Sequence, residues 1–80
     1  MTKIELIERI KSFKKLSKDW DSYSARVIYT ETIELALTLV PILDEKEDWF
    51  TCPCEDGSIR FENDNATKFI DVIYLPETEE

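Results

Sequence analysis

The apolar residues of this chain change their spacing part-way along it. In the first half they recur every three or four residues, which is the repeat of one helix face. In the second half they alternate with polar residues, which is the repeat of a strand with one buried face. This order predicts an α+β fold (ααβββ) in which two helices pack on one face of a three-stranded antiparallel β-meander.

The first helix is expected over Lys3–Leu16. Thr2 and Glu5 have the spacing of a capping box, in which each side chain accepts a hydrogen bond from the other residue's backbone amide. Lysines gather on the side opposite the apolar face. A basic amphipathic helix of this kind can lie on a membrane, but its apolar face is the obvious partner for the second helix and the sheet, so we expect it to pack in the core. The apolar face consists of Leu6, Ile7, Ile10, Phe13 and Leu16.

The second helix is expected over Glu31–Val40, with Thr30 as its N-cap. Pro41 lacks an amide hydrogen, so the helix should stop or kink there. Apolar residues occupy much of the circumference, which predicts a mostly buried helix. These residues are Ile33, Leu35, Ala36, Leu37, Leu39 and Val40.

The only glycine, Gly57, follows Asp56 between two strand-like runs. Asp-Gly in that position predicts a β-hairpin, because glycine accepts a positive φ. A second turn is expected at 63–66, and Pro53 and Pro76 should each end a strand. The expected strands are Trp49–Cys52, Ser58–Glu62 and Lys68–Leu75, of which the third is the longest.

The 80 residues predict one domain over 1–80 with a frayed acidic tail at 76–80. The chain carries a net charge of −8. Residues 1–20 hold six basic and three acidic side chains (+3), and the other 60 hold four and fifteen (−11). This excess argues against direct binding of nucleic acid, whose phosphates need clustered Lys and Arg. Without a membrane-spanning run or a signal peptide, the expected location is the cytoplasm, that of the host for a phage protein.

Most active-site chemistries are excluded by composition. The chain has no histidine, the residue used most often as a general base near neutral pH. A single glycine excludes phosphate-cradling loops. Asp19 and Asp21 flank Trp20 in the manner of a glycosidase carboxylate pair, but so short a chain can hardly build a sugar cleft, and Asp21-Ser22 makes a good turn. We therefore expect no enzymatic activity and no catalytic residues.

Metal and cofactor sites are also not expected. Cys52 and Cys54 offer two thiols one residue apart, whereas structural zinc usually takes four Cys or His ligands, so a site would need a dimer or nearby carboxylates. A disulfide between them would be strained. The acidic stretch Asp44–Asp48 lacks the glycine and spacing of a calcium loop and is expected to be a solvated linker.

Two motifs carry a family resemblance. The first is Trp20-Asp21-Ser22-Tyr23-Ser24-Ala25, and the second is Pro53 followed by Asp56-Gly57-Ser58-Ile59. Both motifs resemble those of a family of small bacterial and phage proteins. The first corresponds to the family's W-D-S-Y-G-A loop, and the second corresponds to its P-x-x-D-G-G-I hairpin. The resemblance runs from about Trp20 to Tyr74, and Ser24 and Ser58 replace glycines of the pattern. It implies the fold and a prokaryotic or phage setting, but no activity.

The remaining function is contact with another macromolecule. We expect an inhibitor of a larger protein or nucleoprotein complex; the alternatives are an antitoxin or immunity protein, and a structural homo-oligomer subunit. Contact could come from acidic side chains that imitate phosphates, or from a sheet edge or aromatic patch. The partner-binding candidates are Tyr23, Tyr29, Asp44, Glu45, Glu47, Asp48, Trp49 and Tyr74.

Overall fold

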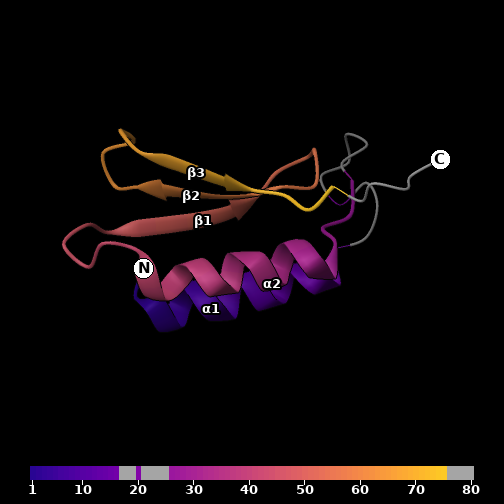
Figure 1. Ribbon diagram of the computed structural model, residues 1–80, viewed down its shortest axis with the longest axis horizontal. Coiled ribbons are helices and arrows are strands. Elements are labelled where there is room, and N and C mark those ends of the chain that lie inside the picture. Colours follow the sequence, from indigo (N-terminus) through magenta and orange to yellow (C-terminus); the bar gives the residue numbers. More distant parts are fainter. Residues whose placement is uncertain (17–19, 21–25, 76–80) are drawn as a thin grey trace.

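The computed structural model describes residues 1–16, 20 and 26–75. Two α-helices, each followed by a 3-10 turn, precede a three-stranded antiparallel sheet of order β1-β2-β3, so the predicted ααβββ meander is confirmed (Figure 1). The elements are α1 (Lys3–Ser12), η1 (Phe13–Lys15), α2 (Thr30–Leu39), η2 (Val40–Ile42), β1 (Trp49–Pro53), β2 (Ile59–Asn63) and β3 (Phe69–Val72). No helix in the described ranges is long and apolar enough to cross a membrane.

Helix α1 begins at the predicted capping box. The Thr2 hydroxyl accepts a hydrogen bond from the Glu5 amide at 3.1 Å, and the Glu5 carboxylate accepts one from the Thr2 amide at 2.7 Å. The α-helix is shorter than predicted, because its last turn, from Phe13, tightens into the 3-10 helix η1. Phe13 still lies in the core, so the tighter turn keeps the predicted apolar face.

Helix α2 starts one residue earlier than predicted, with Tyr29 rather than Thr30 at the N-cap position. It ends before Pro41, as predicted, and the chain continues into the 3-10 turn η2. The prediction of a mostly buried helix is wrong on one side, because Leu35 is 45% exposed. The sheet covers only the side that carries Thr32, Ile33 and Ala36.

The first hairpin has the predicted glycine in the predicted role. Gly57 has φ +93° and donates its amide to the Cys54 carbonyl at 3.0 Å. The Asp56 carboxylate accepts from the Ser58 amide at 2.9 Å and from the Ser58 hydroxyl at 2.6 Å, which fixes the return into β2. A Cβ at Gly57 would lie 3.3 Å from the Val27 carbonyl oxygen, so the turn also packs closely on the segment before α2.

The second hairpin is organised by Asn63, a residue whose side chain is 1% exposed. Its Oδ1 accepts from the amides of Thr67 at 2.8 Å and Lys68 at 2.9 Å. Its Nδ2 donates to the Glu47 carboxylate at 2.8 Å and to the Thr67 hydroxyl at 2.9 Å. Asn63 therefore ties the turn between β2 and β3 to the segment before β1.

The prediction of a long third strand over Lys68–Leu75 is wrong. Strand β3 spans only Phe69–Val72 and is the shortest of the three described strands. Its last pair is Val72 with Ile59, the first residue of β2. Beyond it the chain contacts α2 instead, because the Tyr74 amide donates to the Thr32 hydroxyl at 2.9 Å.

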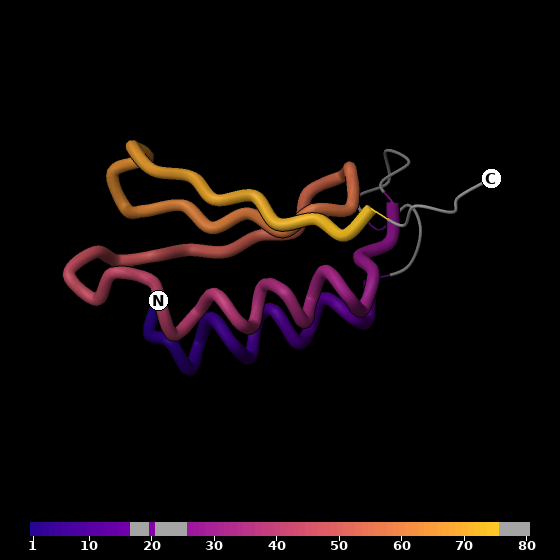
Figure 2. The backbone as a smooth tube through the Cα atoms, viewed as in Figure 1, coloured from indigo at the N-terminus to yellow at the C-terminus, as the bar shows by residue number. Residues whose placement is uncertain are grey.

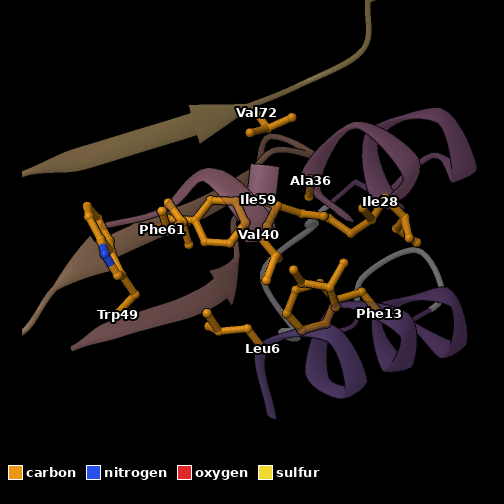
Figure 3. Close-up of a cluster of buried hydrophobic side chains, with 12 residues drawn as sticks. Leu6, Phe13, Ile28, Ala36, Val40, Trp49, Ile59, Phe61 and Val72 are labelled. Atoms are coloured by element: carbon orange, nitrogen blue, oxygen red, sulfur yellow. The ribbon is translucent and has the colours of Figure 1, made fainter. Parts of the chain in front are cut away.

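One layer of two antiparallel helices covers one face of the sheet (Figure 2). Helix α1 lies against β1, and α2 lies against β2 and β3. Residues of both layers interdigitate in a single core, with Trp49 at one end and Ile28 toward the other (Figure 3). The buried apolar residues are Leu6, Ile10, Phe13, Ile28, Ile33, Ala36, Val40, Leu43, Trp49, Ile59, Phe61 and Val72.

Candidate functional site

Two of the predicted partner-binding aromatics form a pair on the surface. Tyr29 precedes α2 and Tyr74 follows β3, and their rings pack edge to face with centroids 6.3 Å apart and an interplanar angle of 85°. The rings stay 45% and 37% exposed, respectively. The bond from the Tyr74 amide to Thr32 holds the backbone in place. The sequence named both residues, but only the fold brings them together.

Further apolar side chains are exposed on the same two elements. Leu35 lies one turn along α2 from the buried Thr32 and is itself half-exposed. Phe69 is exposed at the start of β3, and Ile73 and Leu75 are exposed beyond its end. We call Tyr29, Leu35, Tyr74 and Leu75 the α2–β3 surface. Phe69 and Ile73 are not part of it, because they alternate with the inward-facing Ile70 and Val72 and so lie on the outer face of the sheet, away from the helices. Exposed aromatic and aliphatic groups grouped in this way are typical of protein interaction sites.

The backbone of β3 forms an open edge of the sheet. The Asn63 amide donates to the Lys68 carbonyl, and hydrogen-bonded pairs alternate along an antiparallel ladder. The N–H and C=O groups of Phe69, Asp71 and Ile73 therefore point away from β2. No strand in the described part of the chain lies beyond β3.

The opposite edge, at β1, is partly closed. The Cys54 amide donates to the Ser58 carbonyl, so the same alternation turns the backbone groups of Thr51 and Pro53 outward. The Arg9 guanidinium donates to the Thr51 carbonyl at 2.7 Å, and proline has no N–H to offer. The two edges of the sheet are therefore not equivalent.

The predicted acidic segment, Asp44–Asp48, makes contacts within the fold. Glu45 lies 3.5 Å from the Lys3 ammonium, and Asp48 pairs with the amino group of Met1. Asp44 accepts the Lys46 amide at 2.9 Å. The segment is thus largely solvent-exposed, as predicted, but it is also tied to α1 and turned on itself.

Glu47 is the most engaged of these acids. It accepts from the Lys68 ammonium at 2.7 Å and from Asn63. The hydrogen bond from Lys68, and then that from Asn63, lower the pKa of the Glu47 carboxyl below its ordinary value. Its carboxylate therefore holds the second hairpin and has little left to offer a partner.

The other two aromatic candidates differ in position. Trp49 is only 6% exposed, and its indole donates to the Asp44 carbonyl at 3.1 Å, so the ring belongs to the core rather than to a contact surface (Figure 3). Tyr23 lies outside the described residues, as does the tail 76–80. Of the predicted loop, Trp20 is described, and its indole donates to the Arg26 carbonyl at 3.0 Å.

The two cysteines are free thiols at the end of β1 and are half-buried. Burial, and then the neighbouring Cys54, raise the pKa of the Cys52 thiol. A raised pKa favours the neutral thiol, which is the less nucleophilic form and the poorer metal ligand. Among the described residues, no group of three or more His, Cys, Asp or Glu side chains could hold a metal ion.

A small hollow lies at the start of α1. Its volume is about 210 Å³, below the range of about 300–1,000 Å³ that is typical of small-molecule sites. Its lining is Met1, Thr2, Lys3, Leu6, Leu43, Asp44, Glu45, Glu47 and Trp49. Lys3 and Glu45 form an ion pair within it, so its charged groups already have partners.

Comparisons with protein-family models, with curated proteins and with solved structures give no match. The resemblance to small bacterial and phage proteins therefore stays a prediction. The α2–β3 surface is the candidate site that the geometry supports best.

Sequence reasoning missed two residues of this surface, Leu35 and Leu75. One signal was present, because the apolar run from Phe69 to Leu75 is longer than the strand that can pair with β2. For Leu35 the signal was the excess of apolar residues around α2, which exceeds what one sheet face can cover.

Proposed function

We propose that this protein is a non-enzymatic, acidic protein-binding domain that acts as a phage or prokaryotic inhibitor of a larger protein or nucleoprotein complex. The observation that supports the proposal is the edge-to-face pair of Tyr29 and Tyr74, which stays half-exposed on the surface. Aromatic side chains fixed by a rigid scaffold bury much apolar area at little cost in conformational entropy.

The charge around this surface favours a protein partner over nucleic acid. The segment 27–45, which contains α2, carries four acidic side chains and no basic one. The described segment 69–75 carries one acidic side chain, Asp71, and no basic one. Such a surface repels phosphates and suits a partner that is itself basic, as proteins of nucleoprotein complexes commonly are.

The competing version of this function places the site on the acidic segment Asp44–Asp48. The structure favours the α2–β3 surface, because Glu45, Glu47 and Asp48 are already paired within the fold. Three of the four carboxylates therefore already have a cationic partner within the fold, which reduces what they offer to another protein. The tyrosine pair has no such competing partner to exchange among the described residues.

The test is capture of partners from a host lysate with immobilised wild-type chain and matched variants. Tyr74→Ser with Leu35→Ser removes apolar groups from the surface, and Phe50→Ser is the control, because Phe50 is equally exposed but lies on β1. We expect a specific partner to be retained by the wild type and by the control, and lost from the double variant.

Other results would contradict the proposal. If reversing Asp44 and Glu45 to lysine abolishes capture while the double variant captures normally, the acidic segment is the site. If the wild type captures nothing at low salt, the protein-binding function is wrong. A captured toxin encoded by a neighbouring gene would make the protein an antitoxin or immunity protein instead of an inhibitor.

A further inference from the structure

Strand β3 offers backbone groups as well as side chains. Phe69, Asp71 and Ile73 point their N–H and C=O groups away from β2, as the ladder alternation requires. At the other edge, Arg9 occupies the Thr51 carbonyl and Pro53 has no N–H, so fewer of the equivalent groups are available. An open edge strand can accept an extended segment of another chain as an additional strand.

We propose that β3 binds an extended, basic segment of the partner protein as a fourth strand of the sheet. This inference rests on the proposed protein-binding function and names the way in which the partner binds. Hydrogen bonds to Phe69, Asp71 and Ile73 would supply affinity, and alternate side chains of the segment would supply specificity.

The two faces of the open edge set the pattern of the segment. On the inner face Ile70 is partly buried against the core, and Leu35 is exposed on α2, which lies against β3. The outer face carries Asp71 between the exposed Phe69 and Ile73, and Arg60 of β2 binds Asp71 from one side with two hydrogen bonds of 2.7 and 3.0 Å. An added strand would reach Asp71 from the other side.

A segment that fits both faces has alternating apolar and basic residues. Its apolar side chains would cover Ile70 and Leu35. A Lys or Arg on its outer face would stand opposite Asp71, where opposite charges on neighbouring strands stabilise pairing. The acidic surroundings, including Glu31 and Glu34 on α2, add long-range attraction to the same segment.

A second copy of this chain is the less favoured occupant. Pairing of β3 with β3 of another copy would bring the two Asp71 side chains and the acidic side chains of both α2 helices closer together. In the register centred on Asp71, the two Asp71 side chains would lie directly opposite each other, and like charges in that position destabilise pairing.

The test uses synthetic peptides and amide hydrogen exchange on the whole chain. The probe is the capped heptapeptide Lys-Val-Lys-Val-Lys-Val-Lys, and the control peptides replace each Lys by Glu or the central Val by Pro. We expect the probe to slow exchange at the amides of Phe69, Asp71 and Ile73 and to leave that of Thr51 unchanged. Neither control peptide should do so, and binding of the probe should weaken as salt increases.

Ile73→Pro removes one outward N–H without touching the ladder to β2. It should weaken probe binding by up to about tenfold, the effect of losing one hydrogen bond. Ile73→Thr keeps the N–H and is the matched control, which should bind more tightly than Ile73→Pro. If Ile73→Pro does not fold, the exchange pattern of the wild type with the probe still tests whether the peptide binds at β3.

Three results would overturn the proposal. The first is a probe that leaves exchange at the three edge amides unchanged while the wild type still captures a partner through Tyr74 and Leu35, which would leave protein binding intact and exclude strand addition. The second is equal slowing by the Lys and Glu peptides, which would exclude a basic segment. The third is slowing with rising protein concentration alone, together with a dimer in analytical ultracentrifugation, which would make a second copy the occupant.

Discussion

Replacing Asn63 by alanine should cost this protein more than half of its stability. The side chain is 1% exposed and takes part in four hydrogen bonds, two from backbone amides and two to side-chain oxygens. A net contribution of about 1 kcal/mol for each bond gives about 4 kcal/mol. Water reaching the exposed residues Thr67 and Lys68 should restore about 1 kcal/mol, so the expected loss is about 3 kcal/mol. Domains of this size have about 5 kcal/mol to lose.

The assay is urea unfolding at pH 7, followed by the fluorescence of buried Trp49 and by circular dichroism. Asn65→Ala is the matched control, because Asn65 lies in the same turn, is exposed and makes one side-chain contact, with the Thr67 hydroxyl at 3.1 Å. The control should change the free energy of unfolding by less than about 0.5 kcal/mol. A loss below about 1 kcal/mol for Asn63→Ala would refute the argument that this side chain holds the second hairpin to the segment before β1.

Three other changes have signs that the structure determines. Thr51→Val should raise the free energy of unfolding by about 1 kcal/mol in urea titrations, because the buried Thr51 hydroxyl has no hydrogen-bond partner among the described residues; a loss of stability would show that it has one. Gly57→Ala should destabilise and Ala66→Gly stabilise, each by about 1 kcal/mol, because both residues have positive φ, +93° and 55°; equal signs in thermal unfolding would contradict this. Hydrogen bonds from Ser58 and Arg60 lower the pKa of Asp56 and Asp71, respectively, so their stabilisation is present above the ordinary pKa and is lost as pH falls through the lowered value. The urea concentration at the unfolding midpoint should therefore decrease as the pH is lowered below about 4, and it should decrease less steeply with pH in Asp71→Asn. An unchanged dependence of the midpoint on pH in this variant would exclude Asp71 as a contributor.

Local patterns predicted most of the fold. The capping box at Thr2, the stop before Pro41 and the glycine turn at Gly57 depend on a few neighbouring residues, and all three are confirmed. The end of β3 could not be predicted in this way. Its length is set by how far β2 extends as a partner, which is a property of the pairing and not of the apolar run itself.

The candidate surface was only partly predictable for the same reason. Tyr29 and Tyr74 are far apart in the sequence, and their contact depends on the bond between the Tyr74 amide and Thr32. Trp49 was named as a partner-binding candidate, but the Asp44 carbonyl accepts its indole N–H, so the ring is buried without leaving a polar group unpaired. The residues next to Tyr74 and Trp49 in the sequence carry no signature of these hydrogen bonds to Thr32 and Asp44.

The inequality of the two sheet edges has a consequence for self-assembly. Edge-to-edge polymerisation needs two open edges on each molecule, because each copy must receive one neighbour and offer itself to the next. Here the bond from Arg9 to the Thr51 carbonyl and the missing N–H of Pro53 obstruct β1, while no strand of the described ranges lies beyond β3. A sheet built in this way can gain one additional strand at β3, and further copies then find no second open edge to join. Opening β1 by Arg9→Met with Pro53→Thr would remove that stop and favour filaments.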